Sequence, residues 1–166
     1  MRDLKKWYAL YTNPRAEKKV AQSLQQKDFE VYLPLITTVK QWSDRKKKVE
    51  EPLFKSYLFI HTEHEANHLN ILQTQGVMKF IRIGKEIISI RPQQIEAIKL
   101  LLANESDLEI SNVIYKPGDE VEIFAGPLKG LTGYIIQQKG THNFSLTVEQ
   151  LGTSILITVP SNYLKK

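Results

Sequence analysis

The sequence contains no cysteine, which excludes disulfides, cysteine-ligated metal sites and cysteine nucleophiles. It also lacks any apolar run close to the roughly 20 residues that a membrane-spanning helix needs. The first residues, Met1–Trp7, include basic side chains but no apolar stretch like that of a signal peptide. We therefore expect a cytoplasmic protein with no membrane segment.

Catalytic motifs are missing as well. We find no nucleophile–base set, no paired carboxylates and no phosphate loop, since Gly84-Lys85 stands outside any P-loop context. His64 and His68 are four residues apart on an expected helix, and His61 lies nearby. No cysteine or well-placed acidic residue accompanies them, so we expect no metal, no cofactor and no enzymatic activity.

The charge is unevenly distributed along the chain. The net charge is +5, yet residues 1–105 contain 18 Lys and Arg against 12 Asp and Glu, and residues 106–166 contain 5 against 6. Basic charge in one part of a protein favours binding to polyanions. A solvated basic surface that only keeps the protein soluble is an equally good interpretation of so small an excess.

The first third of the chain predicts a strand, a helix and a long hairpin. Lys6–Thr12 is apolar and aromatic, which is typical of a strand. Asn13-Pro14 then resembles a helix start, with Asn as the N-cap and Pro in the first turn. Phe29–Thr38 and Glu51–Ile60 are extended runs on either side of the polar segment Trp42–Lys48. Apolar residues of the helix recur at helical spacing at Ala16, Val20, Ala21 and Leu24.

Two more helices complete the first domain. Thr62-Glu63-His64-Glu65 has the form of a capping box, and Gly76 is expected to end that helix. Val77–Ile83 and Glu86–Ile90 predict two short strands, and Pro92 opens the last helix. The order of elements predicts an α+β domain over residues 1–104, an antiparallel-rich sheet flanked by three helices. The buried stripe of the last helix would be Ile95, Ile98, Leu101 and Leu102.

The rest of the chain predicts a second, all-β domain. Residues 105–115 begin with polar side chains and show no clear period, so we expect a linker there. Four short β-like runs with glycine-containing turns follow, and they predict a small barrel over residues 116–166. We expect this barrel in the free protein without a switch to helix, because its glycines and β-branched runs disfavour helix. The four runs are Glu120–Phe124, Thr132–Gln137, Phe144–Gln150 and Ser154–Val159.

The segment GDEVEIFAGPLKGLTG, from Gly118 to Gly133, is the most informative part of the second domain. Its glycines tolerate positive φ angles and Pro127 presets a turn, so two strands would be held close by a tight loop with Lys129 at its tip. This arrangement resembles the KOW motif, a small barrel found in transcription elongation factors and some ribosomal proteins. The residues that match are Gly118, Gly126, Pro127, Leu128, Lys129, Gly130 and Gly133.

Segments of the first domain extend this resemblance. Trp7-Tyr8 at the start of a strand, EPLFKSYLFI from Glu51 to Ile60, and Gly76-Val77 before Phe80-Ile81-Arg82 resemble the N-terminal (NGN) domain of NusG-family transcription factors. The KOW-like segment stands where that family carries its C-terminal domain. The sequence of Glu51–Ile60 and the basic hairpin most resemble those of the specialised RfaH and UpxY types. Those act at selected operons, often for surface polysaccharide, by keeping RNA polymerase from pausing or terminating.

The resemblance implies two contacts with RNA polymerase. An aromatic patch would grip a coiled-coil element of the polymerase clamp, and residues near the second helix start would reach the opposite side of the cleft. If both faces of the strand at Tyr57–Ile60 were core, the aromatics would only be structural. The candidates are Tyr11, Phe54, Tyr57 and Phe59 for the patch and His64, Asn67 and His68 for the second contact.

The resemblance also implies contacts with non-template and upstream DNA. Polar and basic side chains of the first helix suit bases and phosphates, and a basic hairpin tip beside a tryptophan suits a DNA backbone and a stacked base. Solvated surfaces are the alternative in both places. The candidates are Asn13, Arg15, Lys18, Lys19 and Gln22 on the helix and Trp42, Arg45, Lys46, Lys47 and Lys48 on the hairpin.

We therefore interpret the chain as a monomeric, NusG-like antitermination factor that binds RNA polymerase and exposed DNA. Its KOW domain would recruit a ribosomal protein or a termination factor, with Phe124, Leu128 and Phe144 as candidate contacts. Burial of all three in the core of the barrel is the alternative. The alternative is a ribosome- or RNA-binding KOW protein that acts in translation. The near-neutral charge beyond residue 105 disfavours RNA as the main partner of that domain.

Overall fold

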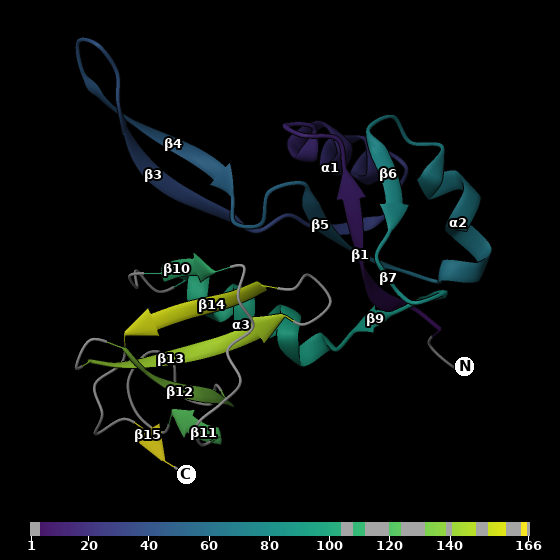
Figure 1. The fold of residues 1–166 in the computed structure, drawn as a ribbon. Coiled ribbons are helices and arrows are strands. Elements are labelled where there is room, and N and C mark those ends of the chain that lie inside the picture. The colour runs from purple at the N-terminus through teal and green to yellow at the C-terminus, as the bar shows by residue number, and fades with distance from the viewer. Residues whose placement is uncertain are drawn as a thin grey trace. The chain divides into compact units, whose positions relative to one another are not determined.

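A computed structural model describes residues 4–103 and the strands at residues 108–111, 120–123, 132–138, 141–148, 153–158 and 164–165. The chain divides into two compact units, Met1–Pro92 and Gln93–Lys166. Figure 1 shows the elements of both. No helix in the described part of the chain is long and apolar enough to cross a membrane.

The first unit is built on an antiparallel sheet in which β1 is central. β5 pairs with one edge of β1, while β6 and β9 pair with different parts of the other edge. β2 lies at the outside, paired with β5. This arrangement confirms the antiparallel-rich α+β fold that the sequence predicts. The strands are β1 (Lys6–Thr12), β2 (Glu30–Tyr32), β5 (Tyr57–Thr62), β6 (Val77–Phe80) and β9 (Ser89–Ile90).

One face of this sheet forms a core with α1 (Glu17–Gln26) and α2 (His64–Leu72). Because side chains alternate along a strand, every second residue of β1 and β5 points to these helices. The apolar spacing predicted for α1 is confirmed for Val20, Ala21 and Leu24, which are buried, whereas Ala16 lies at the N-cap and Glu17 is buried as well. The core includes Tyr8, Leu10, Leu58, Ile60 and Phe80 from strands, Val20, Ala21 and Leu24 from α1, and Ile71 from α2.

The helix start predicted at Asn13-Pro14 is wrong, because α1 begins at Glu17. The backbone N–H of Asn13 donates to the carbonyl of Gly76 (2.9 Å), which holds Asn13 against the loop before β6. Arg15 has a left-handed backbone, with φ at 63°. The chain therefore makes a turn before the helix, and Ala16 occupies the N-cap without a side-chain hydrogen bond.

The capping box predicted at Thr62 is also wrong. Thr62 is the last residue of β5, and Glu63 stands at the N-cap of α2 without a side-chain cap. The Thr62 hydroxyl instead accepts a hydrogen bond from the Asn67 side chain (3.1 Å). Pairing of Thr62 with Lys6 in the sheet takes precedence over the local capping pattern. The helix ends at Leu72, before the glycine predicted to end it.

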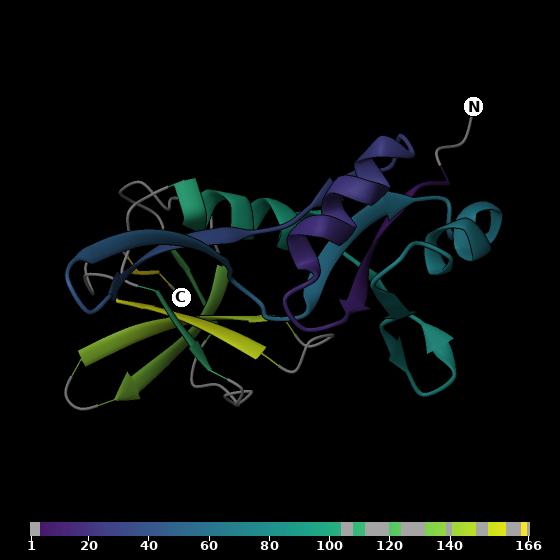
Figure 2. The same ribbon diagram turned by 90° about the horizontal axis from the view of Figure 1, so that it is seen from above.

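A long hairpin of β3 (Leu35–Gln41) and β4 (Lys46–Pro52) projects from the sheet, as the sequence predicts. The extended run predicted over Phe29–Thr38 is divided at Pro34, so β2 and β3 belong to different sheets. Figure 2 shows the hairpin as a ribbon leaving one end of the unit, with α2 at the other end. A second, short hairpin, β7 (Arg82–Ile83) and β8 (Glu86–Ile87), turns at Gly84-Lys85. The strands predicted at Val77–Ile83 and Glu86–Ile90 are each divided between this hairpin and the main sheet.

The boundary between the two units falls at the start of α3 (Pro92–Ala103), which begins at the proline predicted to open it. Its buried residues are Ile95, Ala97, Ile98 and Leu101. The contacts group this helix with the strands that follow it, whereas the sequence placed it in the first domain.

An antiparallel sheet follows in the order β10-β14-β13-β12-β11-β15. β10 lies inside the predicted linker and pairs with β14. That segment is therefore not wholly irregular. Of the KOW-like residues, Gly133 lies in β12 opposite Val121, and the other six lie outside the described residues. The barrel and the domain limits stay predictions. The strands are β10 (Leu108–Ser111), β11 (Glu120–Ile123), β12 (Thr132–Gln138), β13 (Thr141–Val148), β14 (Thr153–Thr158) and β15 (Leu164–Lys165).

Replacement of Gly76 by Ala should strongly destabilise the protein. Gly76 has φ at +94°, and a Cβ atom there would lie 2.7 Å from Cγ2 of the buried Val20. The left-handed backbone and the clash with a stiff side chain together should cost about 3 kcal/mol in chemical unfolding of the full chain. Gly84→Ala is the matched control, because Gly84 is also left-handed (φ +64°) but has open space around it. It should cost only about 1 kcal/mol. Equal losses in the two variants would show that the contact with Val20 is unimportant.

Candidate protein and nucleic-acid interface

The sheet face opposite α1 and α2 carries a group of aromatic side chains. The strand register places Tyr11 beside Tyr57 and Ala9 beside Phe59, and these residues alternate with the core residues of β1 and β5. Tyr32 of β2 stacks on Phe59, with ring centroids 6.3 Å apart. We call this surface the aromatic face and define it as Trp7, Tyr11, Tyr32, Phe54, Tyr57 and Phe59.

The predicted aromatic patch separates into buried and accessible parts. Phe59 is 0 % exposed and Phe54 is 4 % exposed, with the two rings edge to face at 6.1 Å. The interpretation as a central core strand therefore holds for Phe59, whereas Phe54 is buried in the turn between β4 and β5. Tyr57 and Tyr11 are partly exposed, and their ring centroids lie 5.3 Å apart. The accessible part of the predicted patch is therefore the Tyr11–Tyr57 pair.

The tyrosine pair carries two hydroxyls and has an ammonium group beside it. Burial, and then the neighbouring Tyr11, raises the pKa of Tyr57, so its hydroxyl keeps its proton at neutral pH. The ammonium of Lys79 lies 5.7 Å from the Tyr11 ring centroid, within the range of a cation–π contact. The sequence analysis missed Lys79, which the β1–β6 pairing brings opposite Tyr11.

The turn before Tyr57 is fixed by a residue that the sequence analysis also missed. Ser56 has a left-handed backbone (φ 68°), and its N–H donates to Oε2 of Glu17 at 3.1 Å. Glu17 is 5 % exposed, an unusual burial for a carboxylate in the first turn of a helix. Nothing in the local sequence marks this contact, because its two residues are 39 positions apart.

The polar residues proposed for the first helix are all exposed. Asn13 and Arg15 lie in the turn before α1, while Lys18, Lys19 and Gln22 lie on α1 itself. The Lys18 ammonium donates to the backbone carbonyl of Glu50 in β4 (2.9 Å). Lys18 therefore connects the helix to the hairpin.

The hairpin carries its basic side chains on both faces. Trp42 is 45 % exposed, and the ammonium of Lys47 lies 4.5 Å from its ring centroid. Lys40, which pairs with Lys47 in the register, forms an ion pair with Glu51. Lys46 and Lys48 alternate with Lys47 and so point to the other face, where both are exposed. The turn closes through the N–H of Trp42, which donates to the carbonyl of Arg45 (2.7 Å), so Arg45 lies at the tip.

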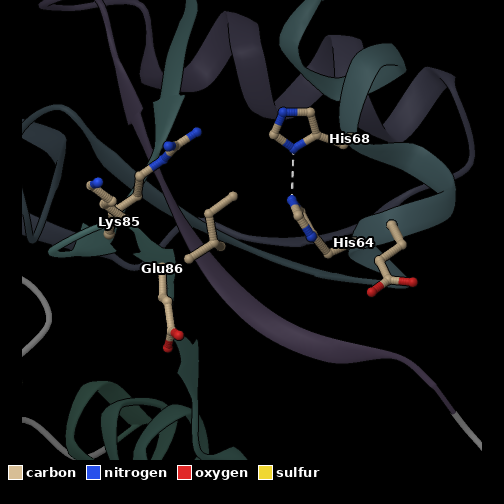
Figure 3. A pocket seen from close by; sticks show the side chains of 7 residues that line it. His64, His68, Lys85 and Glu86 are labelled. Atoms are coloured by element: carbon tan, nitrogen blue, oxygen red, sulfur yellow. Dashed lines mark hydrogen bonds between the residues drawn. The ribbon is translucent and has the colours of Figure 1, made fainter.

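A shallow hollow of about 640 Å³ lies beside the N-terminal half of α2. Figure 3 shows the imidazoles of His64 and His68 turned toward each other from α2, with Lys85 and Glu86 on the opposite side of the hollow. Nε2 of His64 and Nδ1 of His68 lie 2.6 Å apart, and the His68 ring stacks on Phe80. The remaining lining residues are Glu65, Arg82 and Ile87.

The three histidines noted in the sequence do not come together. His61 lies in β5, stacks on Trp7 at 4.9 Å and contacts Oε2 of Glu30 at 2.6 Å. The part of the chain that the structure describes holds no group of three or more side chains arranged to bind a metal ion. Asn67 directs its amide toward Thr62 and the Glu63 carbonyl at the start of α2.

The family model of the transcription termination factor NusG matches residues 5–99. This chain belongs to the NusG family. The termination/antitermination protein NusG of Thermus thermophilus is 28% identical over 149 residues, which cover 79% of this chain and 81% of that protein. NusG of Rickettsia typhi is 23% identical over 177 residues, and the match covers 99% of this chain and 91% of that protein.

A solved structure of NusG from Thermotoga maritima, which was determined in a study of domain interaction, has the same fold. It superposes with a TM-score of 0.55 at 22% identity and covers 98% of this chain and 97% of its own. The NusG match includes every residue proposed for the aromatic face, α1, the hairpin and α2. Membership of the NusG family is thus confirmed, while the roles of single residues and the RfaH or UpxY type stay predictions.

Acidification should destabilise the folded protein through His64. Burial lowers the pKa of His64, and the nearby His68 and Arg82 lower it further, whereas Glu65 acts in the opposite direction. Because the pKa in the folded state lies below the unfolded value of about 6.5, the unfolded chain takes up the proton first as pH falls. The free energy of unfolding should therefore decrease below about pH 6.5.

Urea unfolding at a series of pH values checks this expectation. In His64→Gln the slope of stability against pH between 5 and 6.5 should become smaller. His61→Gln is the matched control, since His61 lies on the other face of the sheet. An unchanged slope in His64→Gln would contradict the assignment.

Proposed function

We propose that this NusG-family chain binds RNA polymerase and DNA in the elongation complex and suppresses pausing or termination at selected operons. The observation that carries the proposal is the accessible Tyr11–Tyr57 pair, on the sheet face that also carries the buried ring of Phe59. Tyrosines on a rigid base bury a large area at small entropic cost and keep a hydrogen-bonding hydroxyl. Such a surface suits an apolar, polar-rimmed element such as the coiled coil of the polymerase clamp.

A second polymerase contact would come from α2. His64 packs on Tyr8, with ring centroids 5.5 Å apart, and Tyr8 belongs to the core face of β1. Tyr11 belongs to the opposite face, so the two proposed contacts lie on different sides of one rigid sheet. A factor that touches both sides of the polymerase cleft would stabilise the closed, elongating enzyme, provided that it binds this state more tightly than the open one.

DNA would bind to the hairpin and to the polar side of α1. Lys46 and Lys48 lie on one hairpin face, and their side chains form no hydrogen bond or ion pair with another described residue, so both ammonium groups are free for phosphates. On the other face, Trp42 beneath the Lys47 ammonium offers a surface on which an unpaired base can stack. Lys18 ties the two DNA-facing elements together through its contact with Glu50.

The finer assignments follow from the resemblance to the RfaH and UpxY types. We propose a cytoplasmic, non-catalytic monomer that acts on operons such as those for surface polysaccharide. The KOW domain would recruit a ribosomal protein or a termination factor. Binding to ribosomal RNA through that domain is the alternative function, and a filter-binding assay of the full chain with ribosomal RNA distinguishes the two.

Tyr57→Ala should weaken binding to RNA polymerase about 10- to 100-fold, as expected for the loss of an aromatic side chain that dominates an interface. The measurement is the dissociation constant of the full chain from an elongation complex formed by the polymerase of the source organism. Leu4→Ala is the control, because Leu4 is exposed and belongs neither to the aromatic face nor to α2, α1 or the hairpin. Affinity within twofold of the parent for Tyr57→Ala would refute the proposed anchor.

The double replacement Lys46→Glu/Lys48→Glu should weaken binding to a DNA scaffold with exposed single strand and flatten its salt dependence. Each lost phosphate contact lowers the slope of log K against log salt concentration by about 0.7 to 0.9. Titrations of the full chain at several salt concentrations give this slope. Lys46→Arg/Lys48→Arg keeps both charges and should retain the slope of the parent. If both double variants bind alike, this hairpin face does not contact DNA.

A further inference from the structure

Glu17 is a buried residue of α1 whose carboxylate binds a residue 39 positions away in the sequence. It is the first residue of α1, and its side chain accepts the backbone N–H of Ser56. A carboxylate withdrawn from water is costly unless it is hydrogen-bonded. The contact with Ser56 meets this need, and it joins α1 to the turn that precedes β5.

That turn has a geometry that serine adopts with difficulty. The N–H of Tyr57 donates to the carbonyl of Phe54 (3.3 Å), which closes a four-residue turn with Ser56 in its third position. A positive φ at this position and none at Lys55, the second residue, correspond to a type II turn, where glycine is the usual third residue. Serine carries a Cβ atom, so another interaction must hold its left-handed backbone (φ 68°). The N–H of Ser56 does not close the turn itself, and Glu17 supplies its acceptor.

The same serine is held from its other side by the sheet. The carbonyl of Ser56 accepts the N–H of Thr12 (2.8 Å), the last residue of β1. The peptide groups of Ser56 are thus fixed between α1 and β1. Tyr57 follows directly and pairs with Tyr11 in the register, so the conformation of Ser56 sets where β5 enters the sheet.

We propose that Glu17 is a positioning residue for the polymerase-binding surface: its carboxylate holds Ser56 in the left-handed conformation and thereby keeps Tyr57 beside Tyr11. This inference rests on the proposed function, because it assumes that the Tyr11–Tyr57 pair is the anchor. The same contact also fixes the position of Lys55, the exposed second residue of the turn.

A rescue experiment separates this role from a general effect on stability. Glu17→Met keeps the length of the side chain but removes the acceptor, and Ser56→Gly removes the steric cost of the left-handed backbone. Glu17→Met should weaken binding of the full chain to the elongation complex about tenfold, as expected for one charged hydrogen bond that fixes a hot-spot residue. The double variant Glu17→Met/Ser56→Gly should recover most of this loss, since glycine adopts the turn unaided.

Two further measurements complete the design. Proton NMR should show that the contact between the Tyr11 and Tyr57 rings weakens in Glu17→Met and returns in the double variant. All binding is measured where unfolding curves show each protein to be folded. Glu96→Met on α3 is the matched control, because Glu96 is exposed and its contact with Lys99 (3.5 Å) is a surface ion pair of little energetic weight.

The outcomes distinguish the inference from the function on which it rests. If Tyr57→Ala weakens binding but Glu17→Met binds like the parent, Glu17 does not position the surface. The same conclusion follows if Glu17→Met weakens binding and Ser56→Gly restores none of it. If neither Tyr57→Ala nor Glu17→Met alters binding, the proposed anchor itself is wrong.

Discussion

The antiparallel pairing of β1 with β5 is the constraint on which the first unit depends. Six consecutive residue pairs, from Lys6↔Thr62 to Tyr11↔Tyr57, fix which side chains point to each face. Leu10 and Leu58 thereby enter the core with α1 and α2, while Tyr11 and Tyr57 meet on the other side. A shift of one residue would exchange the two sets, burying the tyrosines and exposing the core leucines. The same register therefore specifies both the stability of the unit and its candidate binding surface.

The hairpin is stabilised differently from the sheet, because it has little core of its own. An isolated two-stranded hairpin is only marginally stable in water, and most residues of β3 and β4 are exposed. Local contacts offset the repulsion between its lysines: Lys40 pairs with Glu51, and Lys47 covers Trp42. At the base, Lys18 binds a β4 carbonyl. The face with Lys46 and Lys48 has no such compensation among the described residues, so a polyanion placed there would relieve repulsion within the hairpin as well as gain its own contacts.

Periodicity in the sequence predicted the elements of the first unit better than their ends or their pairing. The helical spacing of Val20, Ala21 and Leu24 and the apolar run of β1 reflect burial, which local sequence records. The helix starts were misplaced because Asn13 and Thr62 bond to distant or sheet partners, which outweigh local capping preferences. The sequence could not show that Phe54 and Phe59 are buried while Tyr57 is accessible, because an aromatic side chain suits a core and an interface equally. Glu17 was missed for a related reason: its partner lies 39 residues away and offers a backbone N–H, which every residue except proline has.

Two of these errors, at Asn13 and at the Glu17–Ser56 contact, share a physical origin. In each, a backbone group is held by a partner outside its own element: Asn13 by Gly76, and Ser56 by Glu17 and Thr12. These two segments also contain left-handed residues, Arg15 and Ser56, whose conformations local preferences oppose. Such conformations persist only where the surrounding structure determines them, and they cluster at binding surfaces. Both segments adjoin candidate contact residues: Arg15 precedes the basic side of α1, and Ser56 precedes Tyr57. In these two segments, where the local sequence fails to predict the backbone, α1, β1 and β5 together shape the candidate contact surface.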